Sequence, residues 1–214
     1  MGPNKGTQYI LNVQPVIPFE LNSNWNLITR TVLPITNQPE LAPGVGSAFG
    51  MGDTTFTPFL SPRSNSKFIW GIGPVFLFPT ATNSVLGGEK WGIGPSGVGL
   101  IQEGPWTVGV LGNQIWSVAG NVDHPSISQA LMQPFISYSF PHGWSVSFLS
   151  ESTYNWKATN NNHWLVPLDF TFAKIAIVGK QALSLGAGVR YFPVKPQGQA
   201  VWGLRFTLSL LFPK

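Results

Sequence analysis

The sequence predicts an all-β chain folded as a transmembrane antiparallel up-and-down β-barrel, and three observations lead to this prediction. Charged residues are only 9% of the 214 residues, against 43% hydrophobic ones, whereas about a quarter of an average soluble domain is charged. No run of about 18 apolar residues explains this by a membrane helix. The 24 glycines and 19 prolines are spread along the chain and oppose long helices. Apolar and polar residues alternate, which indicates strands.

Eleven segments show this alternation and are expected to be strands. In chain order they are 9–19, 25–35, 53–60, 68–78, 91–102, 106–118, 129–140, 144–156, 164–173, 183–191 and 200–212. Turn residues, mainly Gly, Pro, Asn and Ser, separate them. Short turns alternate with longer polar connections at 37–50, 80–89, 119–126 and 158–162. This is typical of an up-and-down barrel with tight turns on one rim and loops on the other.

The last segment shows the two expected faces most clearly. Its apolar register consists of Ala200, Trp202, Leu204, Phe206, Leu208, Leu210 and Phe212. The other register holds small and polar residues together with Arg205. A soluble sheet would carry many charges on its outer face, so this polar register suits the interior of a membrane barrel better than a surface in water.

Aromatic residues and segment lengths favour the same choice over a soluble β-fold. Eight tryptophans lie at or near segment ends, where a membrane barrel has its aromatic girdles. They are Trp25, Trp70, Trp91, Trp106, Trp144, Trp156, Trp164 and Trp202. Most of the segments also reach the 9 to 11 residues or so that a tilted strand needs to cross the hydrocarbon layer.

The whole chain, 1–214, is expected to form a single barrel domain. Single-chain bacterial barrels usually close with an even number of strands, and a complete barrel here would have about twelve. The residues from Gly2 to Gly6 read as a turn, so either a partner strand lies upstream of Met1 or the strands are miscounted. No signal peptide is recognisable at the start of the chain.

Five charged residues in the strands are the candidate functional site. Their positions in the alternating registers place them on the polar face of the sheet. They are Arg30, Glu151, Asp169, Arg190 and Arg205. Closure of the barrel would bring them toward a shared lumen, and a basic side chain facing lipid instead would cost about 2 to 4 kcal/mol at the midplane. Two interpretations remain open: a constriction that contacts the permeant, or ion pairs that only neutralise buried charge.

Other kinds of site find little support in the sequence. Cysteine is absent, which excludes disulfides and thiolate metal sites. The net charge of +4 comes from dispersed residues, so we expect no nucleic-acid partner. The three histidines, His124, His142 and His163, lack metal-ligand spacing. Two Gly-Ile-Gly-Pro sequences, at 71–74 and 92–95, lack the following helix of a phosphate loop and indicate close strand contacts or bends. No cofactor and no metal are expected.

Several stretches resemble a family of outer-membrane transporter-like barrels, the neuromedin U or phenol-degradation meta-pathway (MetA) type. They are residues 11–19, 25–30, 71–82, 90–96, 104–109, 133–135 and 210–214. The resemblance covers almost the whole chain. It implies an outer-membrane β-barrel that passes small hydrophobic or aromatic molecules. Members of that family have a signal peptide and a further strand before the turn at residues 2–6, and many outer-membrane barrels end in an aromatic residue, whereas this chain ends in Phe212-Pro213-Lys214.

The expected function is therefore passage of small molecules through the bacterial outer membrane, without catalysis. The expected partners are outer-membrane lipid and a small-molecule permeant. Two other functions stay open. One is a structural barrel with a plugged lumen, because about twelve strands enclose little space. The other is an outer-membrane lipid-modifying hydrolase, which would need a Ser/His/acid cluster at the rim.

Overall fold

The computed structural model describes residues 6–40, 46–64, 66–159, 162–196 and 198–212. Its helical elements in these ranges are two short 3-10 turns, η1 (Ser84–Leu86) and η2 (Pro141–Gly143). The strands are β1 (Tyr9–Val13), β2 (Val16–Glu20), β3 (Trp25–Gln38), β4 (Ala48–Met51), β5 (Thr54–Pro62), β6 (Phe68–Phe78), β7 (Lys90–Glu103), β8 (Trp106–Gly120), β9 (Ser128–Ser139), β10 (Trp144–Ser150), β11 (Ser152–Asn155), β12 (Trp164–Val178), β13 (Gln181–Val194) and β14 (Trp202–Leu211). No helix in the described ranges is long and apolar enough to cross a membrane.

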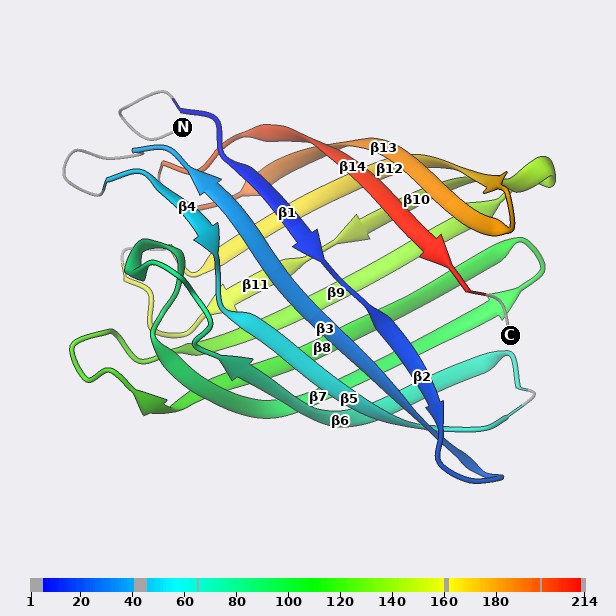
Figure 1. Ribbon diagram of the computed structural model, residues 1–214, viewed down its shortest axis with the longest axis horizontal. Helices are drawn as coiled ribbons and strands as arrows, with labels where there is room; N and C mark the ends of the chain where they lie inside the picture. The colour runs from blue at the N-terminus through cyan, green and yellow to red at the C-terminus, as the bar shows by residue number, and fades with distance from the viewer. Residues whose placement is uncertain (1–5, 41–45, 65, 160–161, 197, 213–214) are drawn as a thin grey trace.

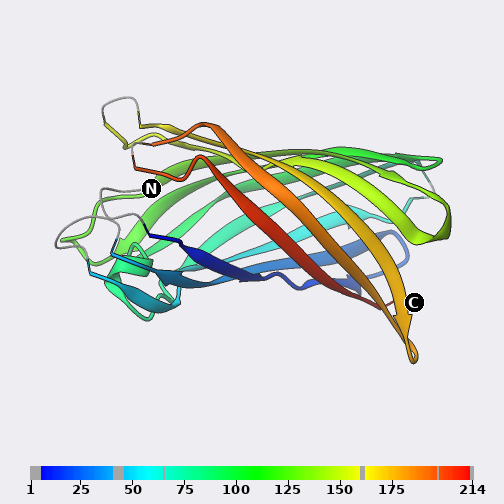
Figure 2. The ribbon, with the colours of Figure 1, turned by 90° about the horizontal axis from the view of Figure 1, so that it is seen from above.

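All fourteen strands belong to one antiparallel sheet, which confirms the predicted all-β class. The order of neighbours is β1-β3-β5-β6-β7-β8-β9-β10-β12-β13-β14. Three pairs of strands follow one another along the same neighbour: β1 and β2 along β3, β4 and β5 along β3, and β10 and β11 along β9. If each such pair is counted as one row, the sheet has eleven rows. Figures 1 and 2 show that the sheet curls into an elongated tube with β1, β2 and β14 along one side.

Each of the eleven predicted segments overlaps a row, but two of them are broken. The predicted strand 9–19 is interrupted at Pro15, which has no backbone N–H to donate to the ladder. The predicted strand 144–156 is interrupted at Glu151. On either side of this break the register places a proline, Pro134 in β9 and Pro167 in β12. Missing donors in the neighbouring rows therefore explain the break.

Residues 48–50 of β4 fall in the stretch 37–50 that is predicted to be a loop, so that prediction is wrong for this part. β4 and β5 pair with β3 in registers that differ by one residue. The irregularity falls at Gly52 and Asp53, opposite Pro34, whose carbonyl accepts from the Gly52 amide at 2.8 Å. Pro34 cannot donate in return, and the bulge adapts the pairing to it.

Two facing Gly-Pro sequences bring β5 to β8 close together, as their glycines predict. Pro74 of β6 lies directly opposite Pro95 of β7. A Cβ atom on Gly73 would lie 1.9 Å from the carbonyl oxygen of Pro58, and one on Gly94 would lie 1.7 Å from that of Gln114. Only glycine fits where backbones approach this closely.

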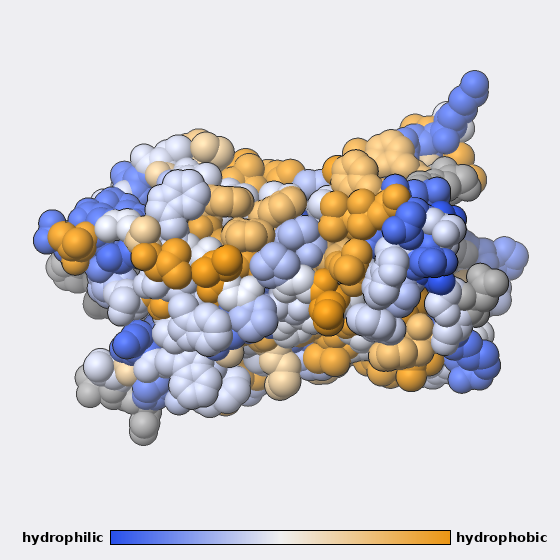
Figure 3. Space-filling model, turned by 90° about the horizontal axis from the view of Figure 1, so that it is seen from below, coloured by the Kyte–Doolittle hydropathy of each residue, from blue (hydrophilic) through white to orange (hydrophobic). Residues whose placement is uncertain are grey.

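The outer face of the curled sheet is apolar and the inner face holds the most buried residues. In β14 the outward side chains are Trp202, Leu204, Phe206, Leu208 and Leu210, all more than half exposed. The inner residues Val75, Asp169, Thr57 and Phe59 are at most 3% exposed. The space-filling view in Figure 3 shows hydrophobic residues across the middle of one face and the most hydrophilic ones mainly at the two ends.

Aromatic side chains gather at both ends of the strands. At the end with the short turns, Trp25 and Trp70 have their ring centroids 6.2 Å apart, and Trp106 lies 4.7 Å from Tyr138. At the end with the longer connections the pairs are Phe78 with Trp91, at 5.6 Å, and Tyr154 with Trp164, at 4.8 Å. Two aromatic belts therefore flank the apolar outer face.

The two edge rows of the sheet run in the same direction. Successive antiparallel pairing over eleven rows makes the row of β1 and β2 parallel to β14. Among the described residues no ladder joins these two rows. The turn that the sequence predicts at residues 2–6 lies, apart from Gly6, outside the described residues.

Candidate functional site: a charged cluster on the inner face

Four charged side chains project from consecutive rows onto the inner face. Glu151 sits in the break between β10 and β11, Asp169 in β12, Arg190 in β13 and Arg205 in β14. Asp169 and Arg190 are direct register partners, and Arg205 pairs with Gly188, two residues from Arg190. The same period-two alternation that points the apolar residues outward turns these four inward.

Both arginines bridge both carboxylates. Arg190 donates from Nε and Nη2 to the two oxygens of Asp169, at 2.7 Å each, and from Nη2 to Glu151 Oε2 at 2.5 Å. Arg205 donates from Nη1 to Glu151 Oε2 and to Asp169 Oδ2, at 3.1 Å each. The contact between Arg190 and Asp169 is the bidentate geometry in which guanidinium and carboxylate planes match. The four groups thus form one closed network.

Because the four side chains are largely buried, each charge depends on the others for its stabilisation. The Asp169 side chain is 1% exposed, and those of Glu151, Arg190 and Arg205 are 21 to 26% exposed. Charges removed from water to this extent are stable only when they are paired. Two positive and two negative groups compensate one another, so the network as a whole carries no net charge.

Arg30 faces this network from the other side of the tube. It lies in β3, opposite Val16 on one side and Thr57 on the other. Its charge interacts electrostatically with that of Glu151, although five rows of the sheet lie between them. Within the described part of the chain the Arg30 side chain makes no hydrogen bond or ion pair. The curl of the sheet therefore brings all five predicted site residues to one region of the interior.

Gln133 is a further inner polar residue, which the sequence analysis did not single out. The register of β9 places it opposite Glu151. Its side-chain oxygen is buried and is the one buried side-chain polar atom without a hydrogen-bond partner among the described residues. Its register also holds Gln129, Ser137 and Ser139, so no pattern in the sequence distinguishes it from other polar residues of that face.

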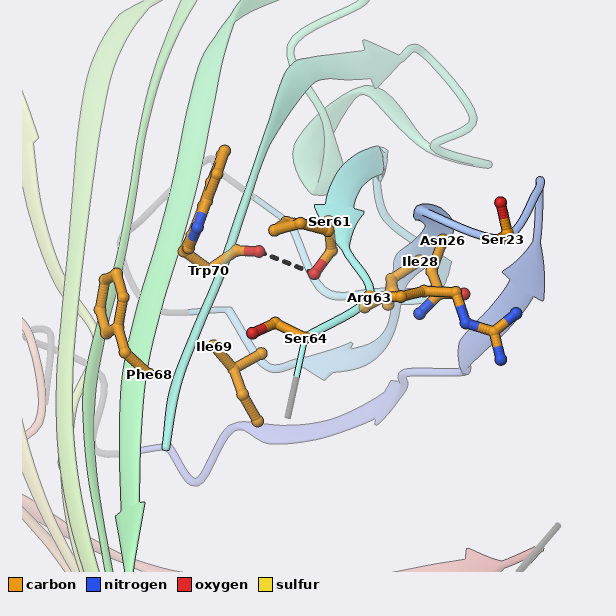
Figure 4. A pocket seen from close by; sticks show the side chains of 10 residues that line it. Ser23, Asn26, Ile28, Ser61, Arg63, Ser64, Phe68, Ile69 and Trp70 are labelled. Carbon is orange, nitrogen blue, oxygen red and sulfur yellow. Dashed lines mark hydrogen bonds between the residues drawn. The ribbon is translucent and has the colours of Figure 1, made fainter. Parts of the chain in front are cut away.

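A cavity of about 660 Å³ opens at the short-turn end of β3, β5 and β6. Figure 4 shows Asn26, Ile28, Ser61 and Ile69 among the side chains that line it, with the Ser61 hydroxyl donating to the Trp70 carbonyl oxygen at 2.7 Å. Asn26, Ile28 and Arg30 are alternate residues of β3 and share its inner face. The cavity thus lies along the same face as Arg30, on the side of the short turns.

The histidines lie in connections and contact neither one another nor a serine hydroxyl in the described ranges. His124 Nε2 is 3.6 Å from Glu89, His142 accepts through its carbonyl oxygen from Lys174, and His163 Nδ1 is 2.9 Å from the Asn155 carbonyl oxygen. No group of three or more His, Asp or Glu side chains with a metal-binding arrangement occurs among the residues that the structure describes.

Comparisons with protein-family models, with curated proteins and with solved structures find no match to this chain. The resemblance to the transporter-like barrel family stays a prediction from the motifs.

Proposed function

We propose that the protein is a bacterial outer-membrane β-barrel that acts as a passive channel for small hydrophobic or aromatic molecules. The observation that carries the proposal is the difference between the outer and inner faces of the curled sheet. An apolar outer face lies between two aromatic belts, while four charged side chains form one network inside and Arg30 lies within electrostatic range of it. Lipid solvates an apolar outer face of this kind, and a water-filled passage or its constriction accommodates charged side chains on the inner face.

In this proposal the cluster of Glu151, Asp169, Arg190 and Arg205, together with Arg30, is the constriction. Fixed charges at a narrow point set which solutes enter and how they orient. No chemical step is required, and no cofactor is proposed. Outer-membrane lipid is the partner of the outer face.

Conductance in planar lipid bilayers tests this function. The wild-type chain should form discrete channels. The constriction holds three arginines and two carboxylates, so Arg205→Ala removes its excess positive charge and should shift ion selectivity toward cations, whereas Asp169→Ala adds to that excess and should shift it toward anions. A matched control is Lys67→Ala, because Lys67 pairs with Glu103 outside the cluster and both side chains are about two-thirds exposed. Unchanged selectivity in both cluster variants would contradict the proposal.

A structural barrel with a closed interior is the second candidate, and burial favours it. Val75 is fully buried, Asp169 is 1% exposed and Thr57 is 2% exposed. In the register of β5 and β6 Thr57 falls opposite Val75, and Arg30 pairs with Thr57, so the inner side chains beside Arg30 are shielded from solvent. A correctly folded wild-type chain that passes no current in bilayers would support this candidate over the channel.

A further inference from the structure

Arg30 is a cation of the inner face that the closed network of four charged side chains does not neutralise. Arg190 and Arg205 each contact both Asp169 and Glu151, which closes that network at zero net charge. Arg30 adds one positive charge close enough to interact with Glu151, but no direct contact to its side chain occurs among the described residues. A guanidinium withdrawn from water calls for an anionic partner.

The surroundings of Arg30 are apolar on one side and polar on the other. Ile28 precedes it on the inner face of β3 and pairs with Phe59, which is 3% exposed. Gln133 lies opposite Glu151, the residue with which Arg30 interacts, and its buried side-chain oxygen has no partner among the described residues. A ligand that fits here carries an anionic group for Arg30, a short apolar body for the side of Ile28 and Phe59, and no large polar surface.

We propose that Arg30 is the specificity-determining residue of the interior and that it binds small carboxylates with a short apolar tail. The cavity of about 660 Å³ at the short-turn end is lined by Asn26 and Ile28, the residues that precede Arg30 on the inner face of β3, and in this proposal it is the entrance to the site. A carboxylate matches the planar guanidinium by a bidentate contact. The inference deepens the proposed channel by naming the chemical class that its constriction selects, but binding does not depend on transport.

Equilibrium binding to the detergent-folded chain is the first test. Butyrate and butyramide have nearly the same shape, and only butyrate is charged. Isothermal titration should detect butyrate binding to the wild-type chain and at least about tenfold weaker binding of butyramide, because a charge-assisted hydrogen bond is lost. Arg30→Met should remove this preference, and Arg30→Lys should keep part of it.

Lys180→Met is the matched control, because it removes one positive charge from an exposed turn between β12 and β13. It should bind butyrate as the wild-type chain does. Folding of every variant is followed by heat-modifiable migration on gels. If Arg30→Met does not fold, Arg30→Gln replaces it with the same expected loss of preference. Wild-type binding of butyrate no tighter than that of butyramide, or full retention of the preference in the neutral variant, overturns the inference.

Bilayer recordings in potassium butyrate separate this inference from the channel proposal. A chain that binds butyrate through Arg30 and carries no current contradicts the channel and leaves the carboxylate site standing. A chain that conducts without preferring butyrate to butyramide contradicts only the carboxylate site. If the chain both conducts and prefers butyrate, Arg30→Met should lower the permeability of butyrate relative to potassium by about fivefold. This is the effect of one unit charge at close range in water.

Discussion

At the scale of single residues, Asp169 holds the charged network together. Its carboxylate accepts hydrogen bonds from both Arg190 and Arg205 and is almost completely withdrawn from solvent. Asp169→Asn keeps the shape but leaves two guanidinium groups with one carboxylate. Breaking a buried ion pair typically costs about 3 to 5 kcal/mol, so the free energy of unfolding in lipid vesicles should fall by about that amount, measured by urea titration with tryptophan fluorescence.

An exposed ion pair provides the comparison for this prediction. Glu103→Gln breaks the contact between Glu103 and Lys67, whose side chains are about two-thirds exposed. Solvent screening limits such a pair to about 1 kcal/mol or less. Equal losses of stability in Asp169→Asn and Glu103→Gln would mean that the inner network is no more coupled than a surface pair.

The sequence predicts which residues turn inward but not which of them touch. Arg190 and Arg205 share the polar register of adjacent strands, so their proximity follows from alternation and from antiparallel order. The interaction between Arg30 and Glu151 is different, because it crosses the tube and depends on how far the sheet curls. Gln133 was not identified, since its unsatisfied oxygen is a property of the packed interior and not of a pattern.

At the scale of elements, the close approach of β7 and β8 depends on Gly94. A methyl group there would lie 1.7 Å from the Gln114 carbonyl oxygen, a backbone atom that cannot move aside without disturbing its strand. Gly94→Ala should therefore lower the free energy of unfolding by about 3 kcal/mol, the upper range for overpacking. Gly203→Ala is the control, because nothing lies within 4 Å of the added carbon. Similar unfolding midpoints for the two variants would contradict this explanation.

The connection that contains η1 is tied to the irregular junction of β4 and β5 by Asp53. One Asp53 oxygen accepts from the Ala81 amide at 3.2 Å and the other from the Gly88 amide at 2.6 Å. Asp53→Ala should increase amide hydrogen exchange across residues 81–88 while the strands keep their protection. Asp123→Ala, in the exposed loop between β8 and β9, should leave this exchange unchanged. Unaltered exchange in Asp53→Ala would show that other contacts hold the connection.

Strand positions are predicted better than strand continuity, for a physical reason. Period-two alternation survives an interruption of the ladder, so Tyr9 to Glu20 reads as one strand although Pro15 breaks it. Pro15 itself gives a local signal for the break. The break at Glu151 has no such local signal, because Pro134 and Pro167 act on it from neighbouring rows. β4 is too short, at four residues, to be distinguished from its loop by pattern.

At the scale of the whole molecule, the low charge content of the chain is explained by where its apolar and charged residues lie. The outer face of β14 is continuously apolar, while the five charged residues of the candidate site gather inside the tube. This arrangement is the reverse of a soluble β-protein, in which the apolar face is packed inside. The proposed channel therefore requires above all that lipid covers the outer face.

Site-directed spin labelling along β14 tests this claim most directly. The chain contains no cysteine, so single cysteines can be placed at Leu204, Phe206 and Leu208 on the outer face and at Thr207 and Ser209 on the inner face. In lipid vesicles, labels at the three outer positions should be accessible to lipid-soluble oxygen and shielded from a water-soluble nickel reagent, while labels at the two inner positions should show low oxygen accessibility. Outer labels that meet the nickel reagent freely, or accessibility without a period of two, would contradict the account.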